Sequence, residues 1–130
     1  MRKIVLDTNV LVSSLWSPGR KPGDIVNAVI AGRFTICYDF RILEEYTNVL
    51  SRPRFGFETW QINALLNPII RAGISVIPDP LPELPFSDES DRKFLEVARF
   101  CHALLVTGNI RHFPEASDIL TVSDFHQLYL

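Results

Sequence analysis

The feature that most constrains the fold is an alternation, along nearly the whole chain, of short apolar runs with longer amphipathic segments. The runs are apolar or β-branched throughout rather than alternating with polar residues, which is typical of strands covered on both faces. They comprise residues 3–6, 34–38, 74–77, 103–106 and 118–122. Strands of this kind that alternate with helices form a parallel sheet. The sequence therefore predicts an α/β fold of three layers (α/β/α), with a central parallel sheet of about five strands.

The segments between these runs carry apolar residues at helical spacing, so we expect them to be helices. They cover residues 7–16, 24–32, 39–52, 58–73, 90–102 and 123–130. Pro68 leaves the middle of the fourth helix open, because proline removes a backbone donor. Ser123 is expected to cap the last helix. Residues 77–90 are rich in proline and are expected to form an extended loop.

Length and composition indicate one globular domain. The chain of 130 residues is expected to form a single unit, residues 1–130, and 47% hydrophobic with 22% charged residues argues against disorder. The formal net charge of −2 is less basic than that of most proteins that bind long nucleic acid by bulk electrostatics. A nucleic-acid enzyme with an acidic metal site remains compatible, because the acids of such a site offset its lysines and arginines.

The cysteines and the N-terminal stretch bear on location. Cys37 and Cys101 lie far apart in the sequence and lack the spacing of a zinc site, so we expect both to be small core residues in a reducing compartment. Asp7 and Asn9 interrupt the first apolar stretch, which argues against a signal peptide. No apolar run of about 18 residues is present, so no membrane span is expected. The predicted location is cytoplasmic.

Polar residues follow the expected strands or begin the expected helices, which is where parallel folds bind ligands. Asp7 follows the first strand and Asn109 the fourth, and neighbouring strands lie about 4.8 Å apart. The other acids near such positions are Asp88, Asp91, Glu44 and Glu45. Converging carboxylates repel one another, and a divalent cation is the usual remedy. Oxygen ligands suit Mg²⁺ or Mn²⁺, which can activate water and neutralise charge on a phosphodiester.

Each of these residues also has an ordinary structural interpretation. Asp7 could cap the helix that follows it, and the two aspartates near residue 90 could be cap and first-turn acids. The two glutamates could belong to a solvated helix face, and Asn109 could be a turn residue after Gly108. These roles suffice for each residue taken alone. Their joint placement at one edge of one sheet is what favours a metal site.

Four stretches resemble the PIN-domain family in their order and spacing: "IVLDTNVLVSSLWSPG", "ILEEYTNVLSRPRF", "DESDRKFLEVA" and "LLVTGNIRHFP". The resemblance covers nearly the whole chain and is nearest to PIN proteins described as toxin components of toxin–antitoxin pairs. It implies a small α/β/α domain with a central parallel sheet. For many members it also implies Mg²⁺- or Mn²⁺-dependent endoribonuclease activity, which is hydrolysis of phosphodiester bonds in RNA.

The resemblance assigns roles to the acids. Asp7, Glu45 and Asp91 match the metal-binding, catalytic acids of the family. The residue pattern alone does not choose between Glu44 and Glu45, and only the resemblance selects the second. Asp88 matches a nearby position that is commonly acidic and could add to the charge of the metal site.

The resemblance implies two further supporting residues, and at one position, residue 109, this sequence differs from the family pattern. Asn9 and Thr107 match polar positions that orient ligands or water. Asn109 stands where active PIN nucleases usually have Asp. An amide can hydrogen-bond but adds no charge, so as a metal ligand it should hold the water of an ion more weakly. We therefore expect one firmly held ion, a second only with substrate, and activity that Asn109 weakens.

Basic residues beside the acidic motifs are candidates for substrate contacts. Arg92, Lys93, Arg111 and His112 could meet phosphates that flank the scissile bond, although exposed basic residues at helix starts are common. A further group could line an RNA groove or, more in keeping with exposed aromatics, a protein contact; it consists of Arg52, Arg54, Phe55 and Phe57. The resemblance also implies a homodimer or higher homo-oligomer and, for a toxin, an antitoxin protein that masks the site.

Two other functions are open at this point. A catalytically weak PIN-like module would bind RNA or protein without cleaving it, and Asn109 is its main support. A phosphatase of the haloacid dehalogenase type would also place an aspartate after the first strand, but it needs a second aspartate two residues later. Asn9 occupies that position, which argues against such a phosphatase.

Overall fold

The computed structural model describes residues 2–130 and confirms the parallel sheet. In this part of the chain five strands pair in parallel in the order β3-β2-β1-β4-β5. Their bounds are β1 Arg2–Leu6, β2 Phe34–Tyr38, β3 Ile74–Ser75, β4 Leu104–Thr107 and β5 Ile119–Thr121. β1 pairs directly with β4, so that Leu6 lies opposite Val106. The strands that precede Asp7 and Asn109 are therefore neighbours.

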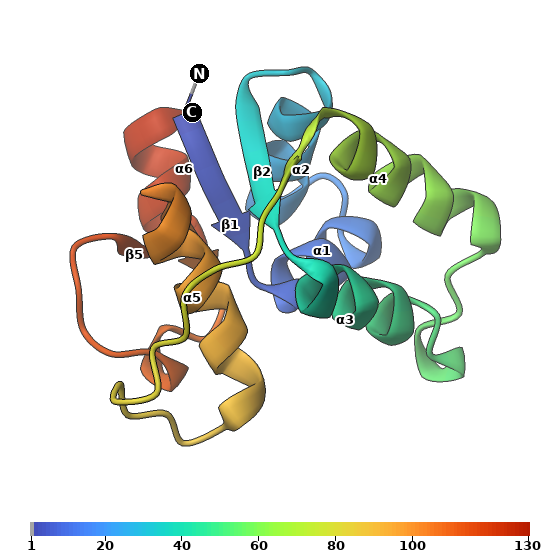
Figure 1. Cartoon of the computed structure of the whole chain (residues 1–130). Helices are drawn as coiled ribbons and strands as arrows, with labels where there is room; N and C mark the ends of the chain where they lie inside the picture. The colour runs from blue at the N-terminus through green and yellow to red at the C-terminus, as the bar shows by residue number, and fades with distance from the viewer. Residues whose placement is uncertain (1) are drawn as a thin grey trace.

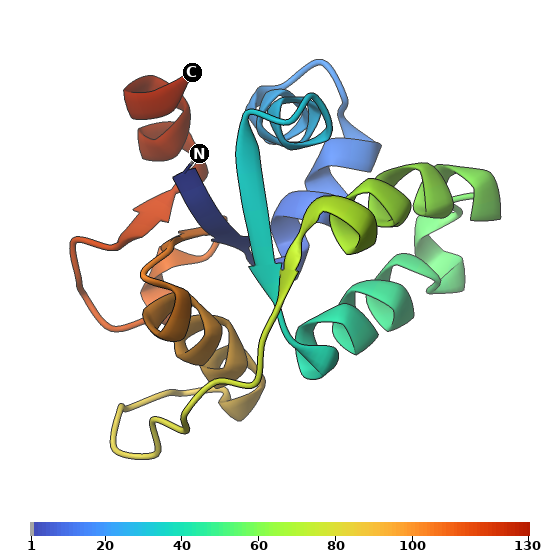
Figure 2. The same cartoon turned by 45° about the horizontal axis from the view of Figure 1, so that its top comes forward.

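Helices cover both faces of the sheet, as expected for three layers. α1 contacts α2, which contacts α4 and α6, whereas α5 packs against β1, β2 and β4. Figures 1 and 2 both show α5 on one side of β1 and β2, with α1 and α2 on the other. The α-helices are α1 Thr8–Trp16, α2 Lys21–Ile30, α3 Phe40–Leu50, α4 Thr59–Ala72, α5 Arg92–Cys101 and α6 Val122–Tyr129. Short 3₁₀ turns are η1 Pro53–Phe55, η2 Glu89–Asp91 and η3 Ile110–His112.

Several expected elements differ in their bounds from the structure, and α2 and β3 are two of them. α2 begins at Lys21, three residues before the expected start at Asp24, because Pro22 in its first turn has the backbone angle of a helix. β3 has two residues rather than the expected four. Val76 still donates its backbone N–H to Tyr38 O at 3.0 Å, and beyond it the chain continues as the expected extended loop, which crosses the front of Figure 1 to reach α5.

Two details at helices also differ. α4 is continuous through Pro68, and buried leucine and isoleucine side chains on both sides of the proline hold its face against the core. Thr121, not Ser123, caps α6, because the Thr121 hydroxyl accepts a hydrogen bond of 3.0 Å from the backbone N–H of Asp124. No loop separates β5 from α6, so Thr121, the last residue of the strand, directly precedes the helix and occupies its N-cap position.

The core contains the apolar runs that predicted the sheet. Ile4, Val5 and Leu6 have no exposed surface, in keeping with a strand covered on both faces. Cys37 and Cys101 are also buried in the core and are free, as expected from their spacing. Burial, followed by a hydrogen bond with Cys101, raises the pKa of the Cys37 thiol to about 12.

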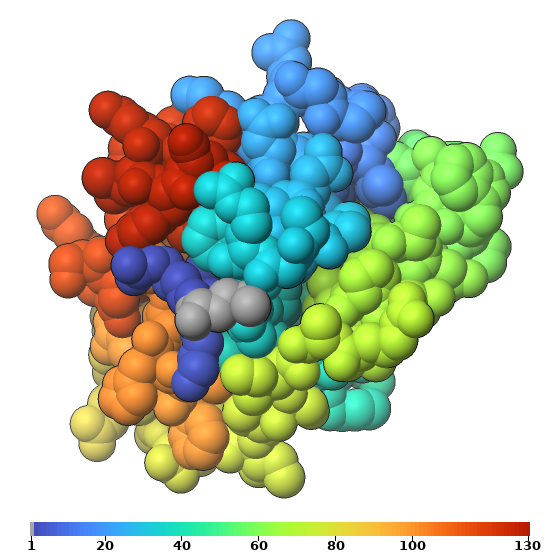
Figure 3. Space-filling view, turned by 90° about the horizontal axis from the view of Figure 1, so that it is seen from above, coloured from blue at the N-terminus to red at the C-terminus, as the bar shows by residue number. Residues whose placement is uncertain are grey.

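The two ends of the sheet differ in what surrounds them. Figure 3 looks onto the end at which β1 begins, beside α6 and the turn from α2 into β2. The carboxyl ends of the strands lie at the opposite end, where the starts of α1, α3 and α5 gather in Figure 1. Within residues 2–130 no helix is long and apolar enough to cross a membrane.

Candidate functional site

Asp7 lies at the point where β1 passes into α1. Its backbone N–H donates to Val106 O across the sheet at 3.0 Å, and the residue takes the N-cap position of α1 with extended backbone. Its carboxylate makes no capping bond to the described part of that helix. Instead Oδ2 accepts a hydrogen bond from Thr107 Oγ1 at 2.7 Å and another from Asn9 Nδ2 at 3.3 Å. The carboxylate is therefore oriented toward the edge of the sheet rather than used as a cap.

The environment of Asp7 is unfavourable for a charge. The residue is 6% exposed, and burial is the main reason why its pKa rises from 3.8 to about 6. The hydrogen bond from Thr107 acts in the opposite direction, while the negative charges of Asp91 and Glu45 raise the pKa further. The pKa of Asp7 therefore responds to the charges of two acids that come from other elements, α3 and the start of α5.

Glu45 belongs to α3. The neighbouring Tyr46 is fully buried, and its hydroxyl donates to Leu6 O at 2.5 Å, which fastens α3 against the end of β1. This contact turns Glu45 toward the site, whereas Glu44 is exposed. The Glu45 carboxylate accepts a hydrogen bond from the Thr8 hydroxyl and forms an ion pair with Lys93.

Asp91 contributes the third carboxylate from the start of α5. Its Oδ2 atom is buried and accepts no hydrogen bond from any residue of the range 2–130. His112 Nδ1 lies 3.4 Å from this oxygen, without the geometry of a hydrogen bond, and offers an ion pair only when the imidazole is protonated. Burial is the first cause of the raised pKa of Asp91, followed by the charge of Asp88. A buried acceptor without a donor is rare and requires a reason.

Asp88 has the structural role that its position suggested. It is exposed, and its Oδ1 accepts hydrogen bonds from the backbone N–H of Ser90 at 2.9 Å and from the Ser90 hydroxyl at 2.8 Å, which caps η2. These bonds lower the pKa of Asp88 below its usual value. Asp88 therefore adds negative charge beside Asp91 but sits at the outside of the site.

Asn9 and Thr107 join the two strand ends around Asp7. Asn9 donates to Asp7 through Nδ2 and accepts through Oδ1 from the backbone N–H of Gly108 at 3.1 Å. A Cβ at residue 108 would lie 3.2 Å from Asn9 Oδ1, so glycine permits this close approach. Thr107 is fully buried and also accepts from the backbone N–H of Asn109 at 2.9 Å. Both residues stand where the resemblance places supporting groups.

Asn109 is an exposed residue at the edge of the site. Its backbone angles, φ −128° and ψ 64°, are neither left-handed nor those of a helix or strand. Its side chain makes no capping bond to η3 in the described chain. A helix cap therefore does not account for the Asn109 side chain.

The basic residues near the acids differ in what they contact. The Nε and Nη2 atoms of Arg92 donate hydrogen bonds to the Glu89 carboxylate. Its Nη1 atom donates to Leu81 O at 2.6 Å and to Leu84 O at 2.7 Å. Arg92 thus holds the proline-rich loop through all three nitrogens of its guanidinium. Lys93 is directed into the site at Glu45, as described above. Arg111 and His112 are exposed on η3 beside the acids.

Two buried acids near α3 and α5 were not recognised in the sequence. Asp39 caps α3 by accepting from the backbone N–H of Ile42 at 2.9 Å, and Arg41 bridges it to Glu96 with contacts of 2.7 and 2.8 Å. Glu96 Oε2 also accepts from the backbone N–H of Leu81 at 2.7 Å. These paired carboxylates join α3, α5 and the loop. Asp39 follows β2 as Asp7 follows β1, so the same strand-end rule could have found it. Glu96 lies within α5, where no local pattern distinguishes a buried acid from a solvated one.

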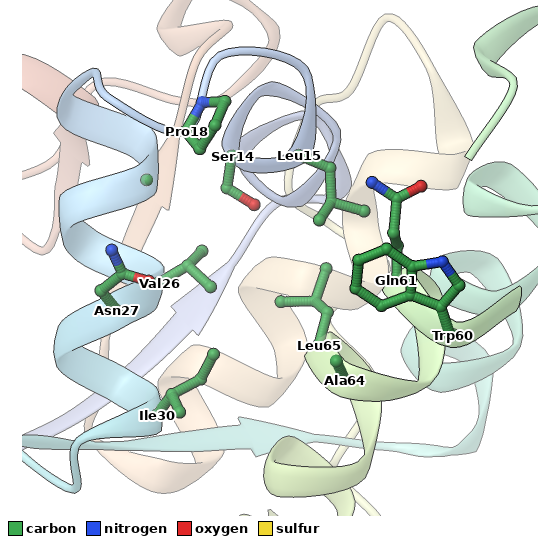
Figure 4. Close-up of a pocket in the computed structure, with 11 residues that line it drawn as sticks. Ser14, Leu15, Pro18, Val26, Asn27, Ile30, Trp60, Gln61, Ala64 and Leu65 are labelled. Carbon is green, nitrogen blue, oxygen red and sulfur yellow. The ribbon is translucent and has the colours of Figure 1, made fainter. Parts of the chain in front are cut away.

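An apolar hollow lies away from the acids. It has a volume of about 260 Å³ between α1, α2 and α4, and Figure 4 shows Leu15, Val26, Ile30 and Leu65 pointing into it. The hydroxyl of Ser14 in its wall donates to Leu11 O at 2.6 Å and so is not free to act as a nucleophile. This hollow contains no carboxylate and is separate from the acidic site.

The donor set of the acidic site fits a hard divalent cation. Three carboxylates come from three elements, two of them have raised pKa values, and Asp91 Oδ2 has no donor. As placed in residues 2–130, no three Asp, Glu, His or Cys side chains converge closely enough to hold a metal ion, and Glu45 is bound by Thr8 and Lys93 instead. Oxygen donors of this kind suit Mg²⁺ or Mn²⁺.

Comparison with known proteins agrees with this arrangement. The family model described as "PIN domain" matches residues 3–111. The chain belongs to the PIN domain family. A relative among curated proteins is an uncharacterized protein of Methanocaldococcus jannaschii, 29% identical over 109 residues that span 82% of this chain and 70% of the relative.

Membership of the PIN family gives the site a general function. PIN domains are generally nucleases, which are hydrolases that bind nucleic acid and typically depend on a divalent metal ion. The family match and the three-layer structure confirm the recognition made from the four sequence stretches. The roles of individual site residues stay predictions.

Proposed function

We propose that this PIN domain is a metal-dependent endoribonuclease that hydrolyses phosphodiester bonds in RNA. The observation that carries the proposal is the buried, donor-free Oδ2 of Asp91, an acid whose charge acts on Asp7 in a chain of a nuclease family. An acceptor left in this state costs about 1–3 kcal/mol unless a ligand satisfies it. A bound cation would remove that cost and the mutual repulsion of the three carboxylates.

The residues of the site have two proposed roles, metal binding and orientation of a metal ligand. Asp7, Glu45 and Asp91 would hold one Mg²⁺ or Mn²⁺ ion, which when bound neutralises phosphate charge and lowers the pKa of a water molecule. Thr107 and Asn9 keep the Asp7 carboxylate in one orientation through the hydrogen bonds to its Oδ2. This prior orientation means that little conformational entropy is lost when the ion binds.

Basic residues at the edge of the site are proposed to contact the substrate. Arg111 and His112 are exposed on η3, with His112 Nδ1 3.4 Å from Asp91 Oδ2. We propose that they contact phosphates that flank the scissile bond. We leave Arg92 out of this set because Glu89 and two loop carbonyls already occupy its guanidinium.

Asn109 is proposed to weaken the site without abolishing activity. Its exposed amide lies beside Thr107 and adds no charge where many PIN nucleases have an aspartate. The alternative function, a PIN-like module that binds RNA or protein without cleavage, is favoured by the same residue. Cleavage separates the two functions directly.

The test is a cleavage assay on single-stranded RNA with Mg²⁺ or Mn²⁺ and with EDTA. We expect metal-dependent cleavage by the native protein, loss of cleavage in Asp7→Asn, and stronger metal binding and faster cleavage in Asn109→Asp. Asp79→Asn, which makes the same change at an exposed loop residue, serves as the matched control. Cleavage that persists in EDTA or in Asp7→Asn would refute the metal-nuclease proposal.

We further propose that the protein acts in the cytoplasm as the toxin component of a toxin–antitoxin pair and forms a homodimer. Free core cysteines support a reducing location. The apolar hollow between α1, α2 and α4, with Trp60 exposed at its edge, supports a protein contact on that face. Light scattering coupled to size exclusion tests the dimer, and a monomer at micromolar concentration would exclude it.

A further inference from the structure

Lys93 occupies an unusual position for a lysine in this molecule. It is the second residue of α5, although a cation is unfavourable at a helix N-terminus because the helix dipole is positive there. Its side chain is only 11% exposed. A lysine in this position needs a strong local reason, and the structure shows one in the acidic site.

The ammonium group of Lys93 is held by the site itself. Nζ lies 2.7 Å from Glu45 Oε1, donates to Ser90 O, and lies 5.0 Å from the centre of the Phe94 ring. Glu45 is one of the three carboxylates proposed to bind the divalent ion. One internal cation therefore already occupies a carboxylate oxygen that the ion needs.

The charge of Lys93 acts on more than one acid. The pKa of Asp91 is raised chiefly by burial, and Lys93 is among the charges that oppose this rise. Lys93 also contributes to the low pKa of Asp88, after the dominant hydrogen bonds from Ser90. Lys93 is thus a counter-ion for the acid cluster and not only a partner of Glu45.

From this geometry we infer that Lys93 is a built-in competitor of the divalent ion, which holds Glu45 in the metal-free protein and must release it before the ion binds. The inference rests on the proposed function of the site as a metal-dependent nuclease. It explains why Glu45 and the other acids do not converge as a ready ion site. The released ammonium stays at the edge of the site, where it can pair with a phosphate of the RNA.

An ordinary stabilising ion pair between α3 and α5 is the rival explanation, and the two differ in one measurable quantity. A competitor lowers the affinity for the divalent ion, so removal of its charge tightens ion binding. A purely stabilising pair leaves ion affinity unchanged or weakens it, because its loss frees Glu45 to move. Stability against urea falls in both cases and does not discriminate.

The experiment measures Mn²⁺ binding by calorimetry, without RNA, for the native protein and two Lys93 variants. Lys93→Met keeps the apolar stem, and we expect its Mn²⁺ dissociation constant to be roughly two- to fivefold lower, in keeping with the strength of ion pairs that are partly exposed. Lys93→Arg keeps the charge and should bind Mn²⁺ like the native protein. Lys21→Met, on α2, makes the same change of net charge away from the acids and should also leave binding unchanged.

The outcomes separate failure of this inference from failure of the proposed function. If Asp7→Asn abolishes Mn²⁺ binding but Lys93→Met binds no tighter than the native protein, the competitor role is overturned and the metal site stands. If the native protein and Asp7→Asn bind Mn²⁺ equally, or neither binds, the metal site fails and the inference with it. Tighter binding in both Lys93→Met and Lys21→Met would reveal a net-charge effect and would also overturn the competitor role.

Discussion

Replacement of Asp7 by asparagine should stabilise the metal-free protein, although it should abolish activity. The folded state raises the pKa of Asp7 from 3.8 to about 6, chiefly by burial, so the fold disfavours its charged form. At about 1.4 kcal/mol per pH unit, this difference corresponds to about 3 kcal/mol at pH 7. Asparagine is neutral and avoids this cost.

The structure indicates that asparagine fits at residue 7. Both hydrogen bonds to the Asp7 carboxylate, from Thr107 and from Asn9, reach the same oxygen, Oδ2. An amide can present its carbonyl oxygen to both donors and direct its NH₂ group to the site. The substitution therefore removes a charge without removing an acceptor, and about 3 kcal/mol is the upper bound of the gain.

The stability gain from Asp7→Asn should depend on pH in a defined direction. Because the folded pKa of Asp7 is raised, its contribution to stability is fully present below pH 3.8 and is lost as pH rises through about 6. The advantage of Asp7→Asn should therefore be largest at pH 7 and about half as large at pH 5. Mg²⁺ should stabilise the native protein and not the variant, since only the native protein binds the ion.

The assay is urea unfolding in EDTA at pH 5 and pH 7, repeated at pH 7 with Mg²⁺. Asp79→Asn is the matched control, because Asp79 is exposed in the loop, and it should change stability by less than about 0.5 kcal/mol. A variant that is less stable than the native protein at pH 7 in EDTA, or whose advantage does not shrink at pH 5, would refute the reasoning.

Three further substitutions test the parts that position the site. Tyr46→Phe leaves the buried Leu6 carbonyl without its donor and should cost about 1–3 kcal/mol in urea unfolding; an unchanged midpoint would contradict this. Thr107→Val removes a direct bond to a proposed metal ligand and should weaken Mn²⁺ binding about 10- to 100-fold in calorimetry, whereas equal affinity would show that the hydroxyl is dispensable. Glu45→Gln should strongly reduce RNA cleavage, while Glu44→Gln, an identical change on the exposed neighbour, should not; equal rates for the pair would exclude Glu45 from the site.

Several features followed from local rules and so were visible in the sequence. The apolar runs predicted buried parallel strands because a strand covered on both faces has no polar side, and Ile4, Val5 and Leu6 are fully buried. Asp7 was located at a strand end because its position depends only on where β1 stops. Composition likewise predicted the extended proline-rich loop and showed that the chain has enough hydrophobic residues to form a core.

The errors concern the bounds of elements and the cap of one helix. Ser123 is a good cap by type, but the chain geometry offers Thr121 first. The third strand was expected over four residues, but only Ile74 and Ser75 pair as a strand. Residue preference is a weak local energy, of about 1 kcal/mol or less, which the surrounding structure readily overrides.

The sequence by itself determined the layered α/β fold, the family and the set of acids from which a site could be built. Only the tertiary structure decided that β4 lies beside β1, which brings Thr107 to Asp7, and that Lys93 pairs with Glu45 rather than with solvent. The physical reason is distance along the chain: Thr107 is 100 residues from Asp7 and Lys93 is 48 from Glu45. Periodicity and capping act over a few residues, whereas these contacts arise when the packed layers bring remote strand and helix ends together.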